Sequence, residues 1–293
     1  MQTTTNTPQS FKDKWEKNTD LAFAQTLRED SDIAQWIMRR NGFASFAECA
    51  SHLAGKERIL DGGCGNGRVT ALLRSLTDPA RTEVVGVDLV ASEVARKNLE
   101  HLENVTLHAG DLLGDLSHLG KFDFIYCQEV LHHTANPRAG FLNLASLLCD
   151  KGELAVYVYK QKAAIREFAD DHIRRVIGPL PYEEAMKACE QVTELGRVLS
   201  QLDVKFTAPA VEVLGIEAGE YDLQRFLYHF FLKCFWNPEF SFHDNAVINY
   251  DWYHPQLCTR HTIEEVLEWC TEAGLRPVHQ CVDHYGITVR AVR

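Results

Sequence analysis

The chain has 293 residues, of which 45% are hydrophobic and 24% charged, and its formal net charge is −11. This length and apolar content can supply the core of one large domain, or of one domain with an inserted part. The acidic balance lacks the basic footprint that drives phosphate-backbone binding, so no nucleic acid partner is expected. The first ten residues are polar, and no apolar run approaches the roughly 20 residues of a membrane span. We therefore expect no membrane partner and a cytoplasmic location.

Nine cysteines are scattered along the chain without any C-x-x-C pair, which is typical of reduced residues in a core. One spacing resembles a metal site, because His254, Cys258 and His261 follow one another within eight positions. These ligand types suit zinc, but a structural zinc site usually has a fourth well-placed ligand. No metal is therefore expected.

Helix signals precede the first strand. Ser31 can cap a helix that carries Trp36 on its apolar face, and Asn41 followed by Gly42 can end that helix. Ser45 has the spacing of a capping box with the glutamate three residues later. We expect an N-terminal helical cap over residues 1–55.

From residue 57 the chain alternates short β-branched or aromatic runs with helical or turn segments. The expected strands are Arg58–Asp61, Glu83–Asp88, Asn104–His108, Phe122–Cys127 and Glu153–Tyr159, followed near the end of the chain by Pro277–Val282 and Gly286–Val292. Repeated strand–helix–strand order predicts an α/β fold with a doubly wound, mostly parallel, seven-stranded Rossmann-like sheet. Residues 56–160 and 261–293 are expected to form this domain.

About a hundred residues separate Tyr159 from the next strand–helix unit, which is too long for a simple connection. We therefore expect a helical insertion after the fifth strand, a lid or substrate subdomain over residues 161–260. Within it, Glu220–Trp236 carries an apolar stripe and further aromatic residues on its other face. Such a helix is buried on two sides, so it is expected to pack over the sheet or to form a homodimer contact. Thr262 and Glu265 then form a capping box that opens the last helix.

The first expected strand runs directly into glycines at every second position. Gly63, Gly65 and Gly67 follow Asp61, whereas a dinucleotide-binding turn would have its third glycine at the position of Arg68. Glycine is favoured where the backbone takes a positive φ or lies against a ligand. A helix that follows the turn directs its free N–H groups at a polar ligand. The segment predicts a nucleotide-binding turn, and Arg68 argues against a dinucleotide.

The turn from Asp61 to Gly67 resembles motif I of the class I S-adenosylmethionine (SAM) dependent methyltransferases. Asp88 ends the second strand, where a carboxylate can accept both ribose hydroxyls. The run from His108 to Leu112 resembles the family motif whose aspartate accepts the adenine amino group. The run from Lys121 to His133 resembles the fourth-strand motif of small-molecule methyltransferases. The resemblance implies that SAM is the cofactor, bound by Asp61, Gly63, Gly65, Gly67, Asp88, Leu89, Asp111, Leu112 and Gln128. For Asp111, a helix-capping role is the alternative.

The resemblance implies a methyltransferase that acts on a small-molecule metabolite by in-line transfer and forms S-adenosylhomocysteine. A second hypothesis is an enzyme of the same fold that attacks the aminocarboxypropyl arm, by transfer or ring closure, and releases methylthioadenosine. The cofactor motifs do not report which sulfonium carbon is attacked. A SAM-binding protein without catalytic activity is the third hypothesis.

Catalytic candidates follow from topology, because ligands lie at the carboxyl ends of parallel strands. His133 and His254 are candidate general bases, since histidine titrates near neutral pH. Tyr253 can present its ring to the sulfonium. Each of these residues has packing as its alternative role. Arg166 or Arg174 can bind a substrate carboxylate, whereas a solvated helix face with ion pairs is the simpler interpretation.

Overall fold

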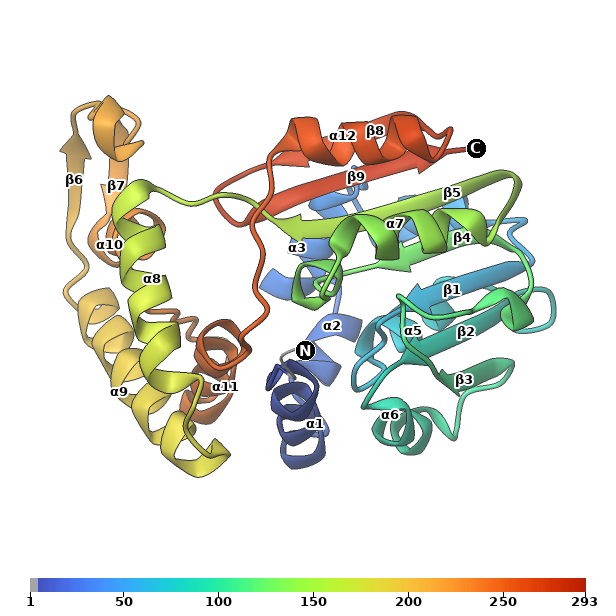
Figure 1. The fold of residues 1–293 in the computed structure, drawn as a ribbon, viewed down its shortest axis with the longest axis horizontal. Coiled ribbons are helices and arrows are strands. Elements are labelled where there is room, and N and C mark those ends of the chain that lie inside the picture. The colour runs from blue at the N-terminus through green and yellow to red at the C-terminus, as the bar shows by residue number, and fades with distance from the viewer. Residues whose placement is uncertain (1–4) are drawn as a thin grey trace. The chain divides into compact units, whose positions relative to one another are not determined.

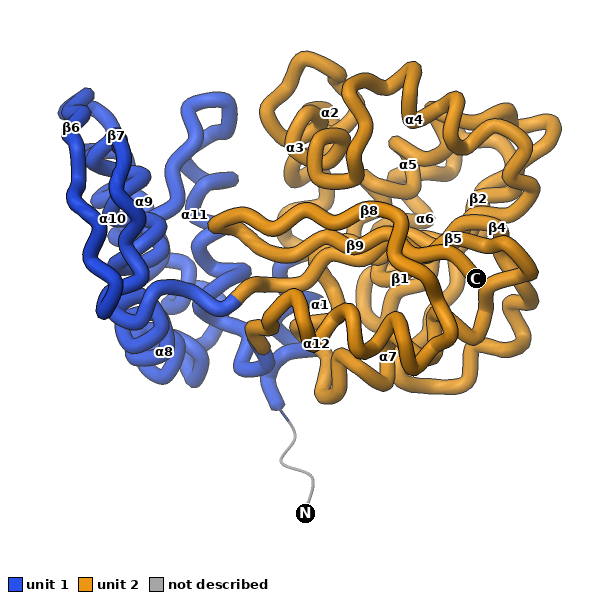
Figure 2. The backbone as a smooth tube through the Cα atoms, turned by 90° about the horizontal axis from the view of Figure 1, so that it is seen from above, with its two compact units in different colours: residues 1–14, 161–258 blue, residues 15–160, 259–293 orange. Residues whose placement is uncertain are grey.

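A computed structural model describes residues 5–293 of the chain, which form two compact units. Unit 1 consists of the described residues up to Lys14 together with Gln161–Cys258, and unit 2 consists of Trp15–Lys160 and Thr259–Arg293 (Figure 2). The N-terminal segment expected to be a separate cap is therefore divided between the units. Its first residues join unit 1 because Asn6 Oδ1 accepts the Gln256 N–H at 2.9 Å.

Unit 2 is built on a seven-stranded sheet with the strand order β3-β2-β1-β4-β5-β9-β8 (Figure 1). The first five strands pair in parallel, β9 runs antiparallel to β5, and β8 runs antiparallel to β9. This arrangement confirms the predicted doubly wound α/β fold, and every predicted strand is present. The strands are β1 (Arg58–Gly62), β2 (Glu83–Asp88), β3 (Val105–Ala109), β4 (Phe122–Cys127), β5 (Leu148–Tyr159), β8 (Arg276–Val282) and β9 (Gly286–Val292).

Both faces of the sheet are buried, so neighbouring residues of a strand pack against different helices. Ile59 belongs to the cluster formed with α3, α4 and α5, whereas the next residue, Leu60, belongs to the cluster formed with α7 and α12. This explains why the central strands are continuous apolar runs. The helices and short 3₁₀ turns of unit 2 are α2 (Phe23–Leu27), α3 (Asp32–Arg40), α4 (Phe46–Leu53), α5 (Arg68–Ser75), α6 (Ser92–Leu99), η1 (Ser117–Leu119), η2 (Leu131–His133), α7 (Pro137–Ser146) and α12 (Ile263–Glu272).

The predicted capping residues are at their helix starts, but at Ser45 the box is incomplete, because Glu48 Oε2 accepts the N–H of Ala44 at 2.6 Å instead of that of Ser45. Ser31 Oγ accepts the Ala34 N–H at 3.2 Å, at the start of α3. At α12, Thr262 and Glu265 accept each other's backbone N–H groups at 3.3 and 2.9 Å, which is the predicted capping box. These local hydrogen bonds satisfy N–H groups that have no partner inside the helix.

Unit 1 is mainly helical and also contains a hairpin that the sequence pattern did not predict. The helix expected over Glu220–Trp236 is shorter, because Gly219–Asp222 pairs instead with Lys205–Ala208. The aromatic side chains of the expected stripe pack on this hairpin, with Phe230 buried beside Ile216. The elements are α1 (Thr7–Lys17), of which the part through Lys14 belongs here, α8 (Ala164–Ile177), α9 (Tyr182–Gln201), β6 (Lys205–Ala208), η3 (Glu212–Leu214), β7 (Gly219–Asp222), α10 (Leu223–Phe230) and α11 (Phe242–Tyr253).

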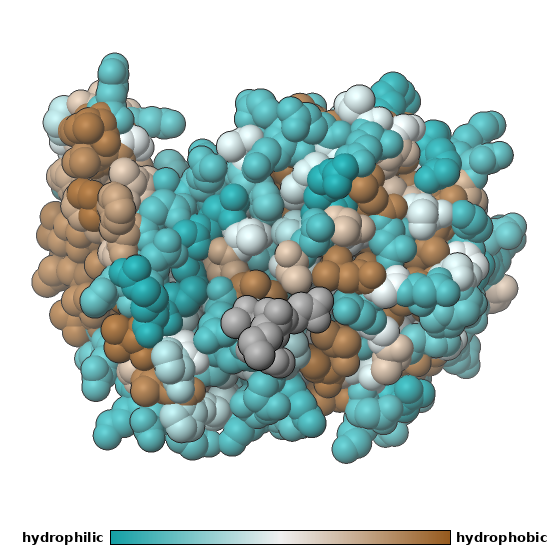
Figure 3. All heavy atoms as spheres, in the orientation of Figure 1, coloured by the Kyte–Doolittle hydropathy of each residue, from teal (hydrophilic) through white to brown (hydrophobic). Residues whose placement is uncertain are grey.

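Apolar side chains also lie on the surface of unit 1, where Figure 3 shows them gathered over the hairpin. Val213, between the two hairpin strands, is 83% exposed, and Leu202 at the end of α9 is 54% exposed. None of the helices within residues 5–293 has the length and apolar character needed to cross a membrane.

Candidate SAM site

The glycine-rich turn connects β1 to α5 at the carboxyl end of the sheet, inside unit 2. Gly63, Gly65 and Gly67 all have positive φ, of 84°, 55° and 89°. A Cβ atom on Gly65 would lie 2.8 Å from Cζ2 of Trp15, so both conformation and space require glycine there. The N–H of Gly63 donates to the carbonyl of Val87 at 2.7 Å, which ties the turn to the end of β2.

Asp88 ends β2 and connects two loops. Its Oδ2 accepts the N–H of Gly65 at 3.0 Å, and its Oδ1 accepts the N–H groups of Val90 and Ala91 at 2.9 and 2.8 Å. A carboxylate has about four acceptor positions, so these three bonds leave capacity on Oδ2. Asp88 is thus held rigidly beside the turn and can still accept a hydroxyl.

Leu89 is the apolar candidate of the site, and the loop after β3 carries the candidates Asp111 and Leu112. Leu89 is 53% exposed, which is an uncovered apolar side chain directly beside Asp88. Asp111 is exposed, and its Oδ1 accepts the N–H of Leu113 at 2.9 Å in a turn rather than at a helix N-terminus. Leu112 is buried in the core, so only its backbone can face a ligand.

Gln128 presents a donor without a partner. Its side chain is buried, and its Oε1 accepts the hydroxyl of Tyr126 at 2.8 Å. That hydroxyl in turn accepts Asn41 Nδ2 at 3.0 Å, and this chain of bonds fixes the orientation of the Gln128 amide. Gln128 Nε2 is buried without a hydrogen-bond partner. The sequence pattern predicts only the end of a helix at Asn41, and it predicts no role for Tyr126.

Asp61 lies beneath the turn and is fully buried. Thr70 Oγ1 donates to its Oδ2 at 2.7 Å. Burial raises the pKa of Asp61 to about 7, against the lowering effect of the Thr70 hydrogen bond and of the nearby Arg68. The carboxyl group therefore titrates near neutral pH.

Arg68, which occupies the position of the third dinucleotide glycine, tethers the turn to other elements. Its Nη1 donates to Thr26 Oγ1 at 3.0 Å, and its Nη2 lies 3.2 Å from Glu129 Oε2. Glu129 follows β4 with a φ of 61°, which is a strained conformation for a residue with a side chain. This strain lies directly after Gln128, at the edge where the cofactor motifs meet.

Two adjacent histidines lie at the carboxyl ends of β4 and β5. The ring of His132 stacks on Tyr159 with centroids 3.6 Å apart, and the ring of His133 lies 4.4 Å from that of His132. Both side chains are buried. Thr259 supports this pair, because its N–H donates to the carbonyl of His132 at 2.8 Å and its hydroxyl lies 2.9 Å from His261 Nε2.

The other two catalytic candidates belong to unit 1. His254 Nε2 lies 2.9 Å from the carbonyl of Leu180, to which it must donate, and its Nδ1 therefore accepts the hydroxyl of Ser10 at 2.8 Å. Burial lowers the pKa of His254, which favours this neutral tautomer. The hydroxyl of Tyr253 lies 2.9 Å from Asp170 Oδ1. Their polar atoms are thus engaged inside unit 1, which favours a packing role for both residues.

The zinc-like spacing does not form a metal centre within the part of the chain that the structure describes. No group of three or more histidine, cysteine, aspartate or glutamate side chains there is placed to hold a metal ion. The sulfur atom of Cys258, the middle residue of that spacing, lies 3.3 Å from Arg174 Nη2.

Comparison with known proteins shows the family of this chain. Residues 53–200, half of the chain, match a family model described as a methyltransferase domain, so the chain belongs to this family. It is 34% identical over 123 residues to the ubiquinone biosynthesis O-methyltransferase of Aromatoleum aromaticum, covering 41% of this chain and 46% of the relative. It is 25% identical over 178 residues to the juvenile hormone acid O-methyltransferase of Bombyx mori, covering 53% and 64%. The match therefore spans less than two thirds of each relative.

Among solved structures, the N-methyltransferase NodS of Bradyrhizobium japonicum in complex with S-adenosylhomocysteine aligns with a TM-score of 0.48 and 15% identity, covering 98% of both chains. The cofactor of a methyltransferase domain of this family is SAM. The residues around the turn fit it: Asp88 retains acceptor capacity, Leu89 is an exposed apolar side chain, and Gln128 has an unpaired buried donor.

Proposed function

We propose that the whole protein transfers the methyl group of SAM to a small-molecule acceptor and releases S-adenosylhomocysteine. The observation that carries this proposal is the Asp88 carboxylate, which is fixed on the Gly65 N–H and retains an acceptor position for a ribose hydroxyl. Gly63, Gly65 and Gly67 shape the turn for the methionine part of SAM, Asp111 and the Leu112 backbone are assigned to adenine, and Gln128 donates from Nε2.

SAM supplies an electrophilic methyl carbon on a sulfonium. Because the displacement is in line, the protein's task is to place the acceptor atom behind that carbon and to exclude water. An acceptor that carries a proton also needs a base. We assign this role to His133, because it is buried at the end of β4 beside His132 and Tyr159. His254 is assigned to packing.

The nucleoside product of the reaction tests this function. When the full-length protein is incubated with SAM and a cell extract as the source of acceptors, we expect S-adenosylhomocysteine, identified by mass spectrometry. Methylthioadenosine as the product would contradict methyl transfer and would support attack on the aminocarboxypropyl arm. SAM binding without either product would support a protein that binds SAM without catalysis. Boiled protein is the control for spontaneous breakdown of SAM.

The class of acceptor and the location of the protein in the cell are also proposals. The net charge of −11 favours a small acceptor over a nucleic acid, and we propose a cytoplasmic location. The homodimer expected from the aromatic stripe remains a prediction. The aromatic stripe now gives less reason to expect a homodimer, because the hairpin of the same unit covers it.

A further inference from the structure

A group of buried and half-buried basic side chains surrounds one tryptophan of unit 1. Trp252, in α11, is 3% exposed. The charged groups of four residues lie over its ring with distances to the centroid of 5.1 to 5.6 Å, namely Lys162, Arg166, Arg174 and Lys233. An aromatic face attracts a cation but does not neutralise it, so this group needs negative charge nearby.

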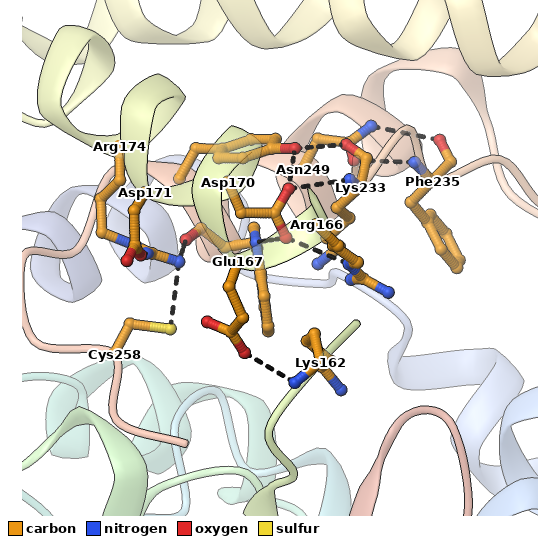
Figure 4. Close-up of polar contacts among 12 residues, drawn as sticks. Lys162, Arg166, Glu167, Asp170, Asp171, Arg174, Lys233, Phe235, Asn249 and Cys258 are labelled. Atoms are coloured by element: carbon orange, nitrogen blue, oxygen red, sulfur yellow. Dashed lines mark hydrogen bonds and ion pairs between the residues drawn. The ribbon is translucent and has the colours of Figure 1, made fainter. Parts of the chain in front are cut away.

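The carboxylates of the same region are already engaged in hydrogen bonds and ion pairs. Asp170 already accepts Arg166 Nε at 3.1 Å, Trp252 Nε1 at 2.9 Å and the Lys233 backbone N–H at 2.9 Å (Figure 4). The hydroxyl of Tyr253, which has a single proton to donate, lies 2.9 Å from Asp170 Oδ1 and 2.8 Å from the carbonyl of Lys233. Asp171 is paired with Arg174 at 2.6 Å. The Oε1 atom of Glu167 accepts the backbone N–H of Lys162 at 2.6 Å.

Two guanidinium groups beside Tyr228 retain unpaired donors on a terminal nitrogen. Arg166 is 1% exposed, and its Nη1 has no hydrogen-bond partner. Arg225 donates through Nη2 to the carbonyl of Trp236 at 3.1 Å, but its Nη1 is buried without a partner. Both guanidinium groups lie over the ring of Tyr228, at 4.6 and 5.6 Å from its centroid. A buried donor of a cation that has no acceptor is costly, so two such donors at one ring indicate a missing anion.

Arg174 differs from these two residues, because both of its terminal nitrogens are engaged and only its Nε is buried without a hydrogen-bond partner. Its Nη1 is paired with Asp171, and its Nη2 donates to the carbonyl of Trp252 at 3.1 Å. The sequence left open whether Arg166 or Arg174 binds a substrate carboxylate, and the contacts favour Arg166. The contacts of Arg225 make it a second candidate, for which the sequence pattern predicts no role.

We propose that Arg166 and Arg225 bind an oxyanion, a carboxylate or a phosphate group, of the small acceptor. This inference rests on the proposed function and names the class of its acceptor. Guanidinium groups suit oxyanions because their planar N–H groups can donate in pairs. Five basic side chains gather around Trp252 and Tyr228, in a chain whose net charge is −11. The aromatic rings add apolar surface, which suits an anion with an aromatic or aliphatic body.

Binding of small probes to the full-length protein tests this site without turnover. We would measure affinities by calorimetry at low ionic strength for benzoate, for phenyl phosphate and for benzamide, the uncharged analogue of benzoate. We expect at least one of the two anions to bind tenfold or more tightly than benzamide. The stronger of the two anions identifies the oxyanion. Equal affinity for the three probes would overturn the proposal.

Arg225→Gln is the decisive variant, because Arg225 has no carboxylate partner to leave unpaired. It is expected to weaken anion binding at least tenfold and to leave benzamide binding unchanged, whereas unchanged anion affinity would overturn the proposal. Arg166→Gln should have the same effect if it folds. Arg197→Gln is the matched control, since Arg197 is in the same unit and pairs with Glu194 on α9. SAM binding is measured in parallel. Anion binding without any SAM binding would contradict the proposed function while supporting the oxyanion site.

Discussion

The buried carboxyl group of Asp61 should make the free energy of unfolding depend on pH. Its pKa is raised from 3.8 to about 7 by burial, so the folded state retains a proton that the unfolded chain loses. The contribution of this proton to the free energy of unfolding is fully present below pH 4. It is lost as the pH rises towards 7. Relative to Asp61→Asn, the wild type should lose about 3 kcal/mol of unfolding free energy between pH 5 and pH 8.

Urea unfolding of both proteins across this pH range measures the difference. The exposed Asp150→Asn is the control for removal of a charge alone. A difference between wild type and Asp61→Asn that stays constant with pH would show that the Asp61 carboxyl does not titrate in this range.

The two histidine candidates can be separated by a pair of matched substitutions. His133→Gln is expected to lower the rate of S-adenosylhomocysteine formation about 100-fold or more, with SAM affinity close to that of the wild type. His254→Gln is expected to keep the rate but to lose about 1–3 kcal/mol of stability, because it disrupts the contacts with Ser10 and Leu180. The rates are measured with cell extract at a temperature where both variants are folded. A folded but inactive His254→Gln would reverse the assignment.

At the scale of elements, α9 approaches a neighbouring segment so closely that it tolerates no side chain at one position. A Cβ atom on Gly196 would lie 2.5 Å from the carbonyl oxygen of Cys234. Gly196→Ala is therefore expected to cost about 1–3 kcal/mol through overpacking, which the midpoint of urea unfolding measures. Gly219→Ala in β7 is the control, because its nearest neighbour would be 3.6 Å away. Equal midpoints for the two variants would contradict the close packing of α9.

Elements with a local signal were the ones that sequence patterns predicted. The strands of unit 2 are apolar on both faces, and Ser31 and Thr262 form caps within three residues, so each signal is contained in a short segment. The hairpin of β6 and β7 lacks such a signal, since its strands have four residues each and lie next to a helical stripe. For the candidate site, Asp88 and Gln128 were predicted from motifs. The roles of Asn41 and Arg225 depend on partners that only the fold brings near.

The division of the whole molecule was predictable in one respect and not in another. The length of the segment after Tyr159 indicated an insertion over residues 161–260, and the structure places the corresponding unit at Gln161–Cys258. That the start of α1 belongs to this unit could not be predicted from the sequence. It is held there because Thr7 Oγ1 accepts the N–H of Leu257, a residue 250 positions away. No local pattern reports a contact of that separation.

This discontinuity of unit 1 affects the order in which the protein can fold during synthesis. Thr7, at the start of α1, is synthesised 250 residues before its partner Leu257. At typical rates of translation that interval lasts about 10 to 50 s. The strands β1 to β5 are all synthesised within it, so the part of the sheet that holds the glycine-rich turn can form before Thr7 meets Leu257. A nascent chain stalled before Leu257 would therefore carry the start of α1 without its contact to Leu257, whereas Trp15, later in the same helix, could already pack beside Gly65.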